Sequence, residues 1–219
     1  MATRARTIPN AASDAPLSPR QRTKVELLLT AERLFAEQGP ENVTLRQIAT
    51  AAGYANPATI QYHFGTKDAL FSEIIRYRLP AIDARRVELL ADQEETTIEQ
   101  LVEAIARPYL ELPPSNHYPA FVGRMVSRLD SVEDVYDAST PHPGGERIRA
   151  DLDRLLADEE PDVRAARLNF ATILMAHAIA DRRNRQSTGR PMLLGEKRFE
   201  QELLQSMASI LDPGGARTR

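Results

Sequence analysis

The stretch that decides the fold is residues 44–70, TLRQIATAAGYANPATIQYHFGTKDAL. Thr44 can accept a hydrogen bond from a free backbone N–H group, and Gln47 can return one, which is the pattern of a capping box. Gly53 supplies the left-handed conformation that commonly ends a helix. We therefore expect a short helix between Thr44 and Gly53.

A second helix start follows within a few residues. Asn56 can cap it with its side chain, and Pro57 suits the first helical position. Spacings of three and four residues predict that Pro57, Ile60 and Phe64 share one inward face. Because the turn is short, the two helices must cross steeply, and the small Ala49 is expected at the crossing. Two helices joined in this way are interpreted as a DNA-binding helix-turn-helix.

The outward face of the second helix carries short polar side chains that suit a major groove. Asn56 and Thr59 can bond base edges, and Ala58 can meet a thymine methyl group. Tyr62 can reach a base or a phosphate. Another helix is predicted to begin at the cap Thr66.

Two further side chains at this end of the motif are candidate phosphate contacts. Lys67 would lie in the first turn of its helix, where its positive charge opposes the helix dipole. A phosphate bound nearby would explain why a lysine occupies this position. For His63, phosphate contact is the functional interpretation and an ordinary surface histidine is the alternative.

This segment, together with LLLTAERLFAEQG at residues 27–39, resembles the N-terminal domain of the TetR family of bacterial transcriptional repressors. The resemblance covers residues 20–75 and rests on these positions: Ala31, Leu34, Phe35, Gly39, Thr44, Ile48, Ala49, Ala52, Gly53, His63, Phe64, Thr66, Lys67, Asp68 and Leu70. The interval from Gly53 to Phe64 is one residue longer than in the family pattern. Gln61 stands at the usual tyrosine position, and Tyr62 follows it.

The resemblance implies a homodimeric, ligand-responsive repressor that binds a palindromic operator in double-stranded DNA and responds to a small-molecule effector. Motif and resemblance together place the following residues at the DNA: Thr44, Gln47, Asn56, Ala58, Thr59, Gln61, Tyr62, His63 and Lys67. The alternatives are a TetR-like activator and a small helical enzyme or ligand carrier that does not bind DNA.

Composition predicts an all-α chain. Its 219 residues can bury a sizeable core, aromatic residues are only 5%, and no alternation of β-branched residues marks a strand. We expect a helix-turn-helix domain at residues 18–78 and a helical ligand-binding and dimerisation domain at residues 79–212, with about nine helices in all. Residues 1–17 are expected to be a disordered basic leader and residues 213–219 a flexible tail.

Charge is distributed unevenly along the chain. The net charge is −3, yet residues 1–80 contain 10 Lys and Arg against 7 Asp and Glu, and the first 24 residues carry +4. This bias is typical of a basic arm that enters a DNA-binding domain. A solubilising disordered leader is an equal interpretation for Arg4 and Arg6.

Several function classes are disfavoured. The chain has no cysteine, which excludes disulfides and thiolate metal sites and fits a cytoplasmic protein. No apolar segment is long enough for a signal peptide or a membrane span, so no membrane partner is expected. Common catalytic and nucleotide-binding motifs are missing, so we expect no enzyme, cofactor or metal.

Turn-forming residues delimit the other helices. Ser18-Pro19 predicts the start of the first helix and Gly39-Pro40 its end. Pro80 lies inside the helix that starts at Thr66, so a kink is expected, either structural only or able to transmit ligand-driven motion. Further helices are predicted at residues 98–110, 119–129, 146–157, 162–185 and 196–211, with separators at 113–116, 141–145 and 189–191.

The last two predicted helices are the candidate dimer interface. The helix at residues 162–185 is apolar almost all round and must be covered on several sides. An intermolecular four-helix bundle with the final helix, which resembles how the family dimerises, would cover it, and a buried core helix of a monomer is the alternative. The predicted interface residues are Ile173, Leu174, Leu203, Leu204 and Met207.

By resemblance, the helices of the second domain also surround an effector cavity, for which a small, largely apolar effector is expected. The candidate lining residues are Tyr109, Phe121, Met125, Leu129, Asn169, Met175 and His177, and plain core packing is the alternative for each. His177 interrupts an apolar run one turn before Asp181. It could orient a ligand, or it could be an interface histidine satisfied by Asp181.

Overall fold

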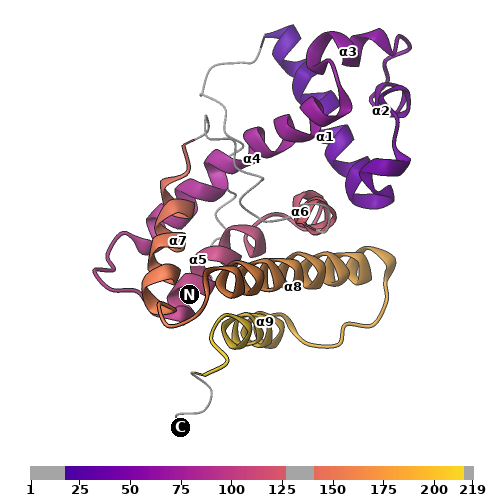
Figure 1. Ribbon diagram of the computed structural model, residues 1–219. Coiled ribbons are helices and arrows are strands. Elements are labelled where there is room, and N and C mark those ends of the chain that lie inside the picture. The colour runs from indigo at the N-terminus through magenta and orange to yellow at the C-terminus, as the bar shows by residue number, and fades with distance from the viewer. Residues whose placement is uncertain (1–17, 127–140, 215–219) are drawn as a thin grey trace.

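A computed structural model of the protein describes residues 18–126 and 141–214. These residues are helical and contain no β-strand, as the all-α expectation requires (Figure 1). The helices are α1 Pro19–Gln38, η1 Pro40–Asn42, α2 Leu45–Ala51, α3 Ala58–Phe64, α4 Lys67–Leu90, α5 Ile98–Leu110, α6 Tyr118–Val126, α7 Pro143–Leu155, α8 Pro161–Thr188 and α9 Glu196–Leu211. In the described part of the chain, no helix is both long and apolar enough to cross a bilayer.

Local capping explains where the N-terminal helices begin. Ser18 and Gln21 form a capping box at α1, and Thr44 and Gln47 form another at α2. At α2, the Thr44 N–H donates to Gln47 Oε1 at 2.7 Å, and the Gln47 N–H donates to Thr44 Oγ1 at 3.2 Å. Gly53, with φ of 84°, takes the left-handed conformation that the sequence predicts for the turn.

The helix-turn-helix region and the rest of the chain share one hydrophobic core. Phe35 of α1 and Phe71 of α4 both contact Phe121 of α6, with ring centroids 6.4 and 4.8 Å apart. Helix α4 continues through the expected domain boundary at residues 78–79 and contains Pro80. Movement of α4 would therefore reach the helix-turn-helix directly.

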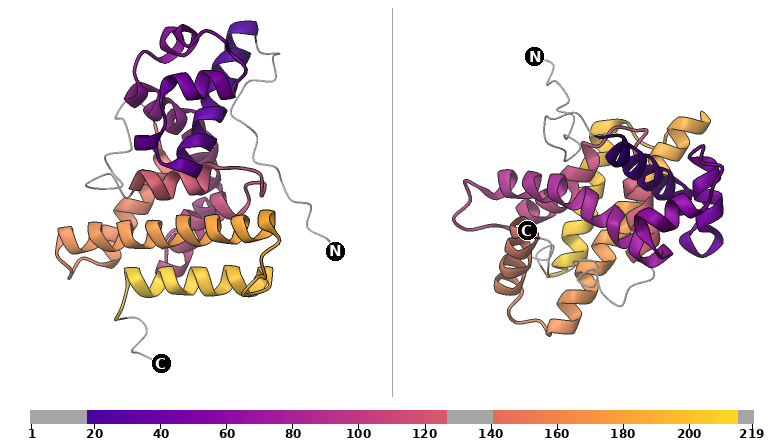
Figure 2. Two further views of the ribbon diagram at one scale, coloured as in Figure 1. Left: turned by 90° about the vertical axis from the view of Figure 1, so that its right-hand side faces the viewer. Right: turned by 90° about the horizontal axis from the view of Figure 1, so that it is seen from above.

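The remaining helices form the body below this region (Figure 1). Helix α8 packs between α6 and α9, while α5 contacts α4, α7 and α9. The views in Figure 2 show α8 and α9 side by side at the end of the molecule opposite α2 and α3. Between these neighbours α8 buries Ala171, Thr172, Met175, Ala176 and Ile179, while Phe170 on the same helix stays exposed.

Helix α7 begins three residues earlier than predicted. The carboxylate of Asp83, on α4, accepts hydrogen bonds from the N–H groups of Gly144 at 3.0 Å and Gly145 at 2.8 Å, so it caps the first turn. A Cβ on Gly144 would lie 2.7 Å from Arg86 Cβ and 2.9 Å from the Asp83 carbonyl oxygen. The predicted separator is therefore partly helix, because glycine allows α7 to approach α4 closely.

Other boundaries agree more closely with the sequence. Helices α5 and α9 match residues 98–110 and 196–211, and α8 is longer than expected at both ends. Helix α6 begins at Tyr118, and the predicted extension to Leu129 lies outside the described residues, as does the expected leader at residues 1–17.

Candidate nucleic-acid interface and ligand pocket

The start of α3 depends on Asn56. Its Oδ1 accepts a hydrogen bond from the Ala58 N–H at 2.9 Å, which fixes the first turn. Ile60 and Phe64 are buried, as predicted. Pro57 is exposed, so the prediction that it shares their inward face is wrong. Pro57 is the cap residue before α3, so the helical spacing that turns Ile60 and Phe64 inward does not apply to it.

The outward face of α3 is open to solvent. Tyr62 is 69% exposed, and Asn56, Ala58 and Gln61 are also exposed. Thr59 is half-buried. These positions give the short helix a polar surface with one large aromatic ring, which is suited to a groove of DNA.

Arg20 extends this surface. Its guanidinium carbon lies 5.2 Å from the centroid of the Tyr62 ring, which is a cation–π contact between the first turn of α1 and α3. The sequence assigns Arg20 only to a basic arm. The structure places its charge beside the recognition helix, a position that the sequence spacing of 42 residues could not indicate.

Thr44 and Gln47 are exposed, and they are hydrogen-bonded to each other. Gln47 Oε1 accepts bonds from the backbone N–H and, at 2.8 Å, the hydroxyl of Thr44. The amide NH₂ of Gln47 therefore has a defined direction at the N-terminus of α2, where backbone N–H groups and the helix dipole favour an anion.

Lys67 has partners within the protein that the sequence does not predict. Its ammonium group donates to the carbonyl oxygens of Pro40 at 2.8 Å and Val43 at 3.4 Å. These bonds tie the start of α4 to the loop that follows α1. A phosphate is therefore not needed to explain a lysine at this position.

His63 is half-buried between cations. Burial lowers its pKa below the ordinary value of 6.5, and the positive charges of Arg20 and Lys24 lower it further. Lys24 also forms an ion pair with Glu73 at 2.6 Å. His63 is therefore neutral at pH 7 and can act as a hydrogen-bond donor or acceptor.

Comparison with known proteins agrees with this geometry. The model for "Bacterial regulatory proteins, tetR family" matches residues 27–74, which run from Leu27 within α1 to Ile74 within α4. The HTH-type transcriptional repressor Rv3405c of Mycobacterium tuberculosis is 29% identical over 199 residues, spanning 89% of this chain and 92% of that protein. The HTH-type transcriptional repressor KstR2 of Rhodococcus jostii is 36% identical over 81 residues, 36% of this chain and 39% of that protein.

The fold matches as well as the motif. A crystal structure of a tetR-family transcription regulator from Shewanella sp. PV-4 superposes with a TM-score of 0.53 over 85% of this chain and 96% of that one, at 17% identity. Residues 27–74 form a DNA-binding domain of the TetR family of bacterial regulatory proteins. The chain is a DNA-binding transcriptional regulator of the helix-turn-helix type, and the proteins that it resembles are regulators rather than enzymes.

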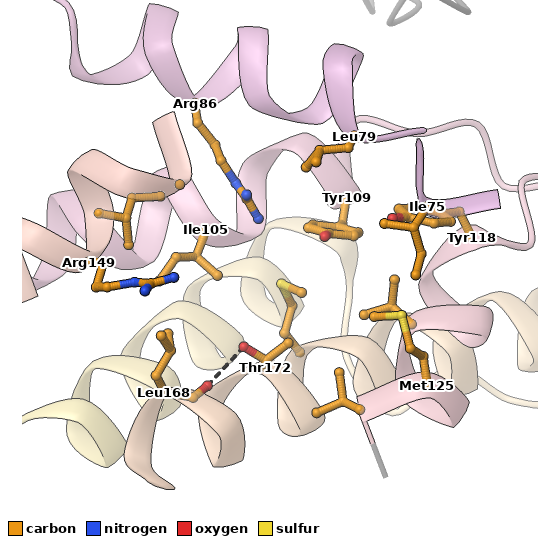
Figure 3. A pocket seen from close by; sticks show the side chains of 15 residues that line it. Ile75, Leu79, Arg86, Ile105, Tyr109, Tyr118, Met125, Arg149, Leu168 and Thr172 are labelled. Carbon is orange, nitrogen blue, oxygen red and sulfur yellow. Dashed lines mark hydrogen bonds between the residues drawn. The ribbon is translucent and has the colours of Figure 1, made fainter. Parts of the chain in front are cut away.

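The body contains a cavity of about 60 Å³ between α4, α5, α6, α7 and α8 (Figure 3). Its lining residues are Ile75, Leu79, Arg86, Ile105, Tyr109, Tyr118, Val122, Met125, Val126, Gly145, Ile148, Arg149, Leu168, Thr172 and Met175. This volume holds a few water molecules. Pockets for small ligands measure roughly 300–1,000 Å³, so the cavity is closed to an effector in this conformation.

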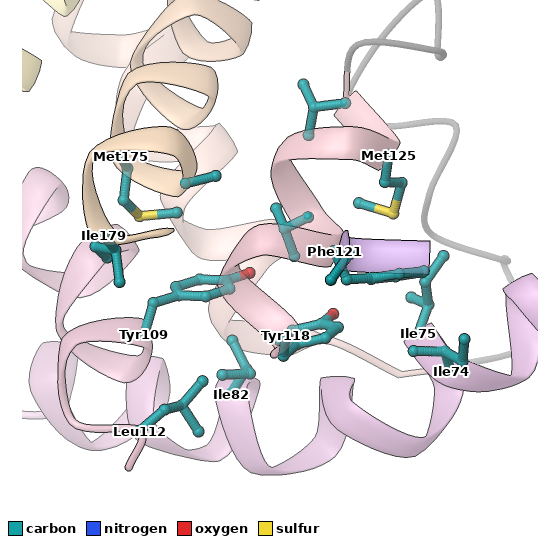
Figure 4. Packing of buried hydrophobic residues seen from close by; sticks show 14 of the residues in the cluster. Ile74, Ile75, Ile82, Tyr109, Leu112, Tyr118, Phe121, Met125, Met175 and Ile179 are labelled. Carbon is teal, nitrogen blue, oxygen red and sulfur yellow. The ribbon is translucent and has the colours of Figure 1, made fainter. Parts of the chain in front are cut away.

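The predicted pocket residues divide into two groups. Tyr109, Met125 and Met175 line the cavity. Phe121 does not, because its ring is fully buried in the junction with α1 and α4 and stacks on Tyr118 at 5.9 Å between centroids (Figure 4). That prediction is corrected: Phe121 belongs to the core that joins the helix-turn-helix to the body.

Asn169 and His177 also lie outside the lining. The Oδ1 atom of Asn169 is buried without a hydrogen-bond partner. His177 is exposed on α8, with its ring beside Gly123 of α6. The carboxylate of Asp181 accepts a hydrogen bond from Arg185 Nε at 2.6 Å, so its partner on α8 is an arginine one turn later.

The structure adds polar lining residues that the sequence does not indicate. Arg86 and Arg149 extend from α4 and α7 toward the cavity (Figure 3). The hydroxyl of Thr172 donates to the Leu168 carbonyl oxygen at 2.8 Å. An arginine within a charged helix is usually solvated, so only the packing of α7 on α4 shows that these two face inward.

The predicted interface residues divide into a buried group and a half-buried group. Leu203 and Met207 are 4% and 0% exposed within one chain, so their assignment to an interface is wrong. They pack inward because α9 contacts both α5 and α8. Ile173, Leu174 and Leu204 are half-buried, and Phe170 on α8 is 57% exposed.

Proposed function

We propose that this TetR-family regulator is a homodimeric, ligand-responsive repressor that binds a palindromic operator in the cytoplasm. The observation that carries the proposal is the course of α4. This helix begins beside α3 at Thr66 and then supplies Ile75, Leu79 and Arg86 to the wall of the cavity. The relatives Rv3405c and KstR2, both named as repressors, support the sign of regulation.

In this proposal α3 enters the major groove. Asn56, Ala58, Thr59, Gln61 and Tyr62 face base edges, and the exposure of all of them but half-buried Thr59 supports this orientation. Thr44, Gln47 and neutral His63 contact the phosphate backbone from the ends of the motif. Arg20 joins them because it stacks on Tyr62.

The second copy would cover the outer side of α8. Phe170 is a large, exposed aromatic side chain, and half-buried Ile173, Leu174 and Leu204 extend the apolar surface around it. A two-fold dimer would place its recognition helices about 34 Å apart, or a multiple of that distance, and would read two matching half-sites.

Ligand response requires an effector that binds one conformation of α4 better than another. An effector larger than the present cavity must separate the helices around it, and α4 would transmit this displacement to α3. An effector that weakens operator binding tenfold must itself bind the DNA-free protein tenfold tighter, a coupling of about 1.4 kcal/mol.

The experiment uses genomic fragments captured by the purified protein. We expect fluorescence anisotropy to show tight binding to a palindrome, and Tyr62→Ala to weaken it. Val87→Ala serves as the control, because Val87 is also exposed but lies on α4 away from the motif. Transcription from the captured promoter should fall when wild type is added. Equal affinity of both variants, or increased transcription, would contradict the corresponding part of the proposal.

A further inference from the structure

We infer that Glu26 of α1 is a positioning residue for the recognition helix α3, on which it acts through Tyr54. The hydroxyl of Tyr54 donates a hydrogen bond to Glu26 Oε2 at 2.7 Å, across 28 residues of sequence. The inference rests on the proposed function, because it takes α3 as the element that reads the operator. Neither residue of the pair belongs to the outward face of α3, so their effect on DNA recognition is indirect.

Tyr54 lies in the turn that connects α2 to α3. Its N–H group donates to the Ala49 carbonyl oxygen at 2.9 Å, which closes the end of α2. Two residues later, Asn56 starts α3. Its Oδ1 atom accepts from the Ala58 N–H at 2.9 Å, and its carbonyl oxygen accepts from the Thr59 N–H at 3.1 Å. A displacement of Tyr54 would therefore reach the first turn of α3 almost directly.

The length of this turn gives a contact with α1 a purpose. The turn belongs to the interval between Gly53 and Phe64, which is one residue longer than in the family pattern. A longer connection restricts the helices that it joins less than a short one does. Tyr54 is half-buried against the core, and its hydroxyl bonds the exposed Glu26. This bond ties the turn to α1, which also packs against α2 (Figure 1).

Helix α1 also contacts the last turn of α3. Arg20 lies over the Tyr62 ring, and Lys24 Nζ lies 5.8 Å from the centroid of the Phe64 ring. The ion pair with Glu73 at 2.6 Å holds Lys24 in place. The tyrosine–carboxylate bond thus restrains the side of α3 that these contacts do not reach. Side chains that read bases must be held to within about 0.5 Å by the residues behind them, so this restraint affects recognition.

Discrimination between DNA sequences tests the inference, because base reading depends on the orientation of α3 and phosphate attraction carries no sequence information. The measured quantity is the ratio of the affinities for the captured operator and for a scrambled duplex of the same length. Tyr54→Phe removes the donor hydroxyl, and Glu26→Ala removes the acceptor. Each should lower this ratio about fivefold, which corresponds to the loss of one hydrogen bond. A ratio that Tyr54→Phe leaves unchanged would overturn the inference.

Glu26→Gln separates the hydrogen bond from the charge. Its amide oxygen can still accept from Tyr54, so the ratio should stay within about twofold of wild type, although the lost negative charge strengthens binding to both duplexes. Glu37→Ala is the matched control, since Glu37 is another exposed acid of α1 and pairs with Arg33 of the same helix. Tyr54→Phe and Glu26→Ala combined should lower the ratio no more than either alone. Equal losses in Glu26→Gln and Glu26→Ala, or additive losses in the double variant, would contradict the assignment.

Amide hydrogen exchange without DNA separates this inference from the proposed function. Exchange of residues 58–64 should be about fivefold faster in Tyr54→Phe and Glu26→Ala than in wild type and Glu26→Gln, with exchange in α5 unchanged. Unaltered exchange in α3 would refute the positioning role and leave operator binding by wild type intact. Faster exchange in α3 of a protein that prefers no DNA sequence would refute the proposed operator binding and leave the positioning role of Glu26 standing.

Discussion

Glu32 of α1 and Arg78 of α4 form a bidentate ion pair, in which Arg78 Nε donates to Glu32 Oε2 at 2.7 Å and Nη2 donates to Oε1 at 2.9 Å. The Glu32 side chain is 2% exposed. Arg78 also lies over the ring of Tyr118, at 5.8 Å from its centroid. One guanidinium thus connects the first helix of the DNA-reading region to α6 of the body.

Loss of this guanidinium should be costly. Arg78→Met would leave the Glu32 carboxylate buried without its partner, and we expect the free energy of unfolding to fall by about 3–5 kcal/mol. Urea titration followed by circular dichroism measures the change. Arg76→Met is the control, because Arg76 pairs with Glu73 at the surface and should cost less than about 1 kcal/mol. Similar losses in both variants would contradict the prediction.

The glycines at the start of α7 and α9 should respond differently to alanine. A Cβ on Gly144 would overlap α4, so Gly144→Ala should destabilise the fold by about 1–3 kcal/mol. Gly195, with φ of −63° and open space around it, should accept alanine within about 0.5 kcal/mol. Thermal and urea unfolding of both variants check this, and a tolerated Gly144→Ala would show that α7 can withdraw from α4 at little cost.

Arg20 should contribute to DNA affinity through charge rather than base recognition. Arg20→Gln is expected to weaken binding to every sequence and to reduce the slope of log affinity against log salt by about one. Arg33→Gln removes the same charge from α1 at a position paired with Glu37, and should leave the slope unchanged. The measurement is anisotropy over a range of potassium chloride concentrations. An identical slope in wild type and Arg20→Gln would remove Arg20 from the interface.

The outer face of α8 should hold the dimer together. Phe170→Arg would place a charge in the centre of the proposed apolar interface, so we expect monomers by light scattering. Val87→Arg introduces the same charge at another exposed apolar position and should leave the dimer intact. A monomeric wild type, or a dimeric Phe170→Arg variant, would place the interface elsewhere or exclude it.

Protonation of His63 should oppose folding. Its pKa is lowered by burial and by Arg20 and Lys24, so the unfolded chain binds a proton more readily near pH 6.5 than the folded chain does. The free energy of unfolding should therefore fall as the pH drops below 6.5. His63→Gln should lose less stability than wild type between about pH 7.5 and about pH 5.5. If urea titrations show that wild type and His63→Gln lose the same free energy of unfolding between these two pH values, the assignment is contradicted.

The sequence by itself determined where most helices begin and end. The capping boxes at Ser18 and Thr44, the cap at Thr66 and the left-handed Gly53 all depend on residues within four positions of one another. Such interactions follow from side-chain chemistry and the helical repeat, so they can be predicted without knowing how the chain packs. The exposed face of α3 follows from the same periodicity, apart from Pro57 before its first turn.

Only the tertiary structure decided which partner each side chain meets. Lys67 bonds carbonyls 24 and 27 residues away, and Asp83 caps a helix 61 residues later. Leu203 and Met207 turn inward rather than toward a second copy, while Arg86 and Arg149 meet at one cavity. Periodicity predicts that a helix has an apolar face, but the helix that covers this face is set by close packing of the whole chain.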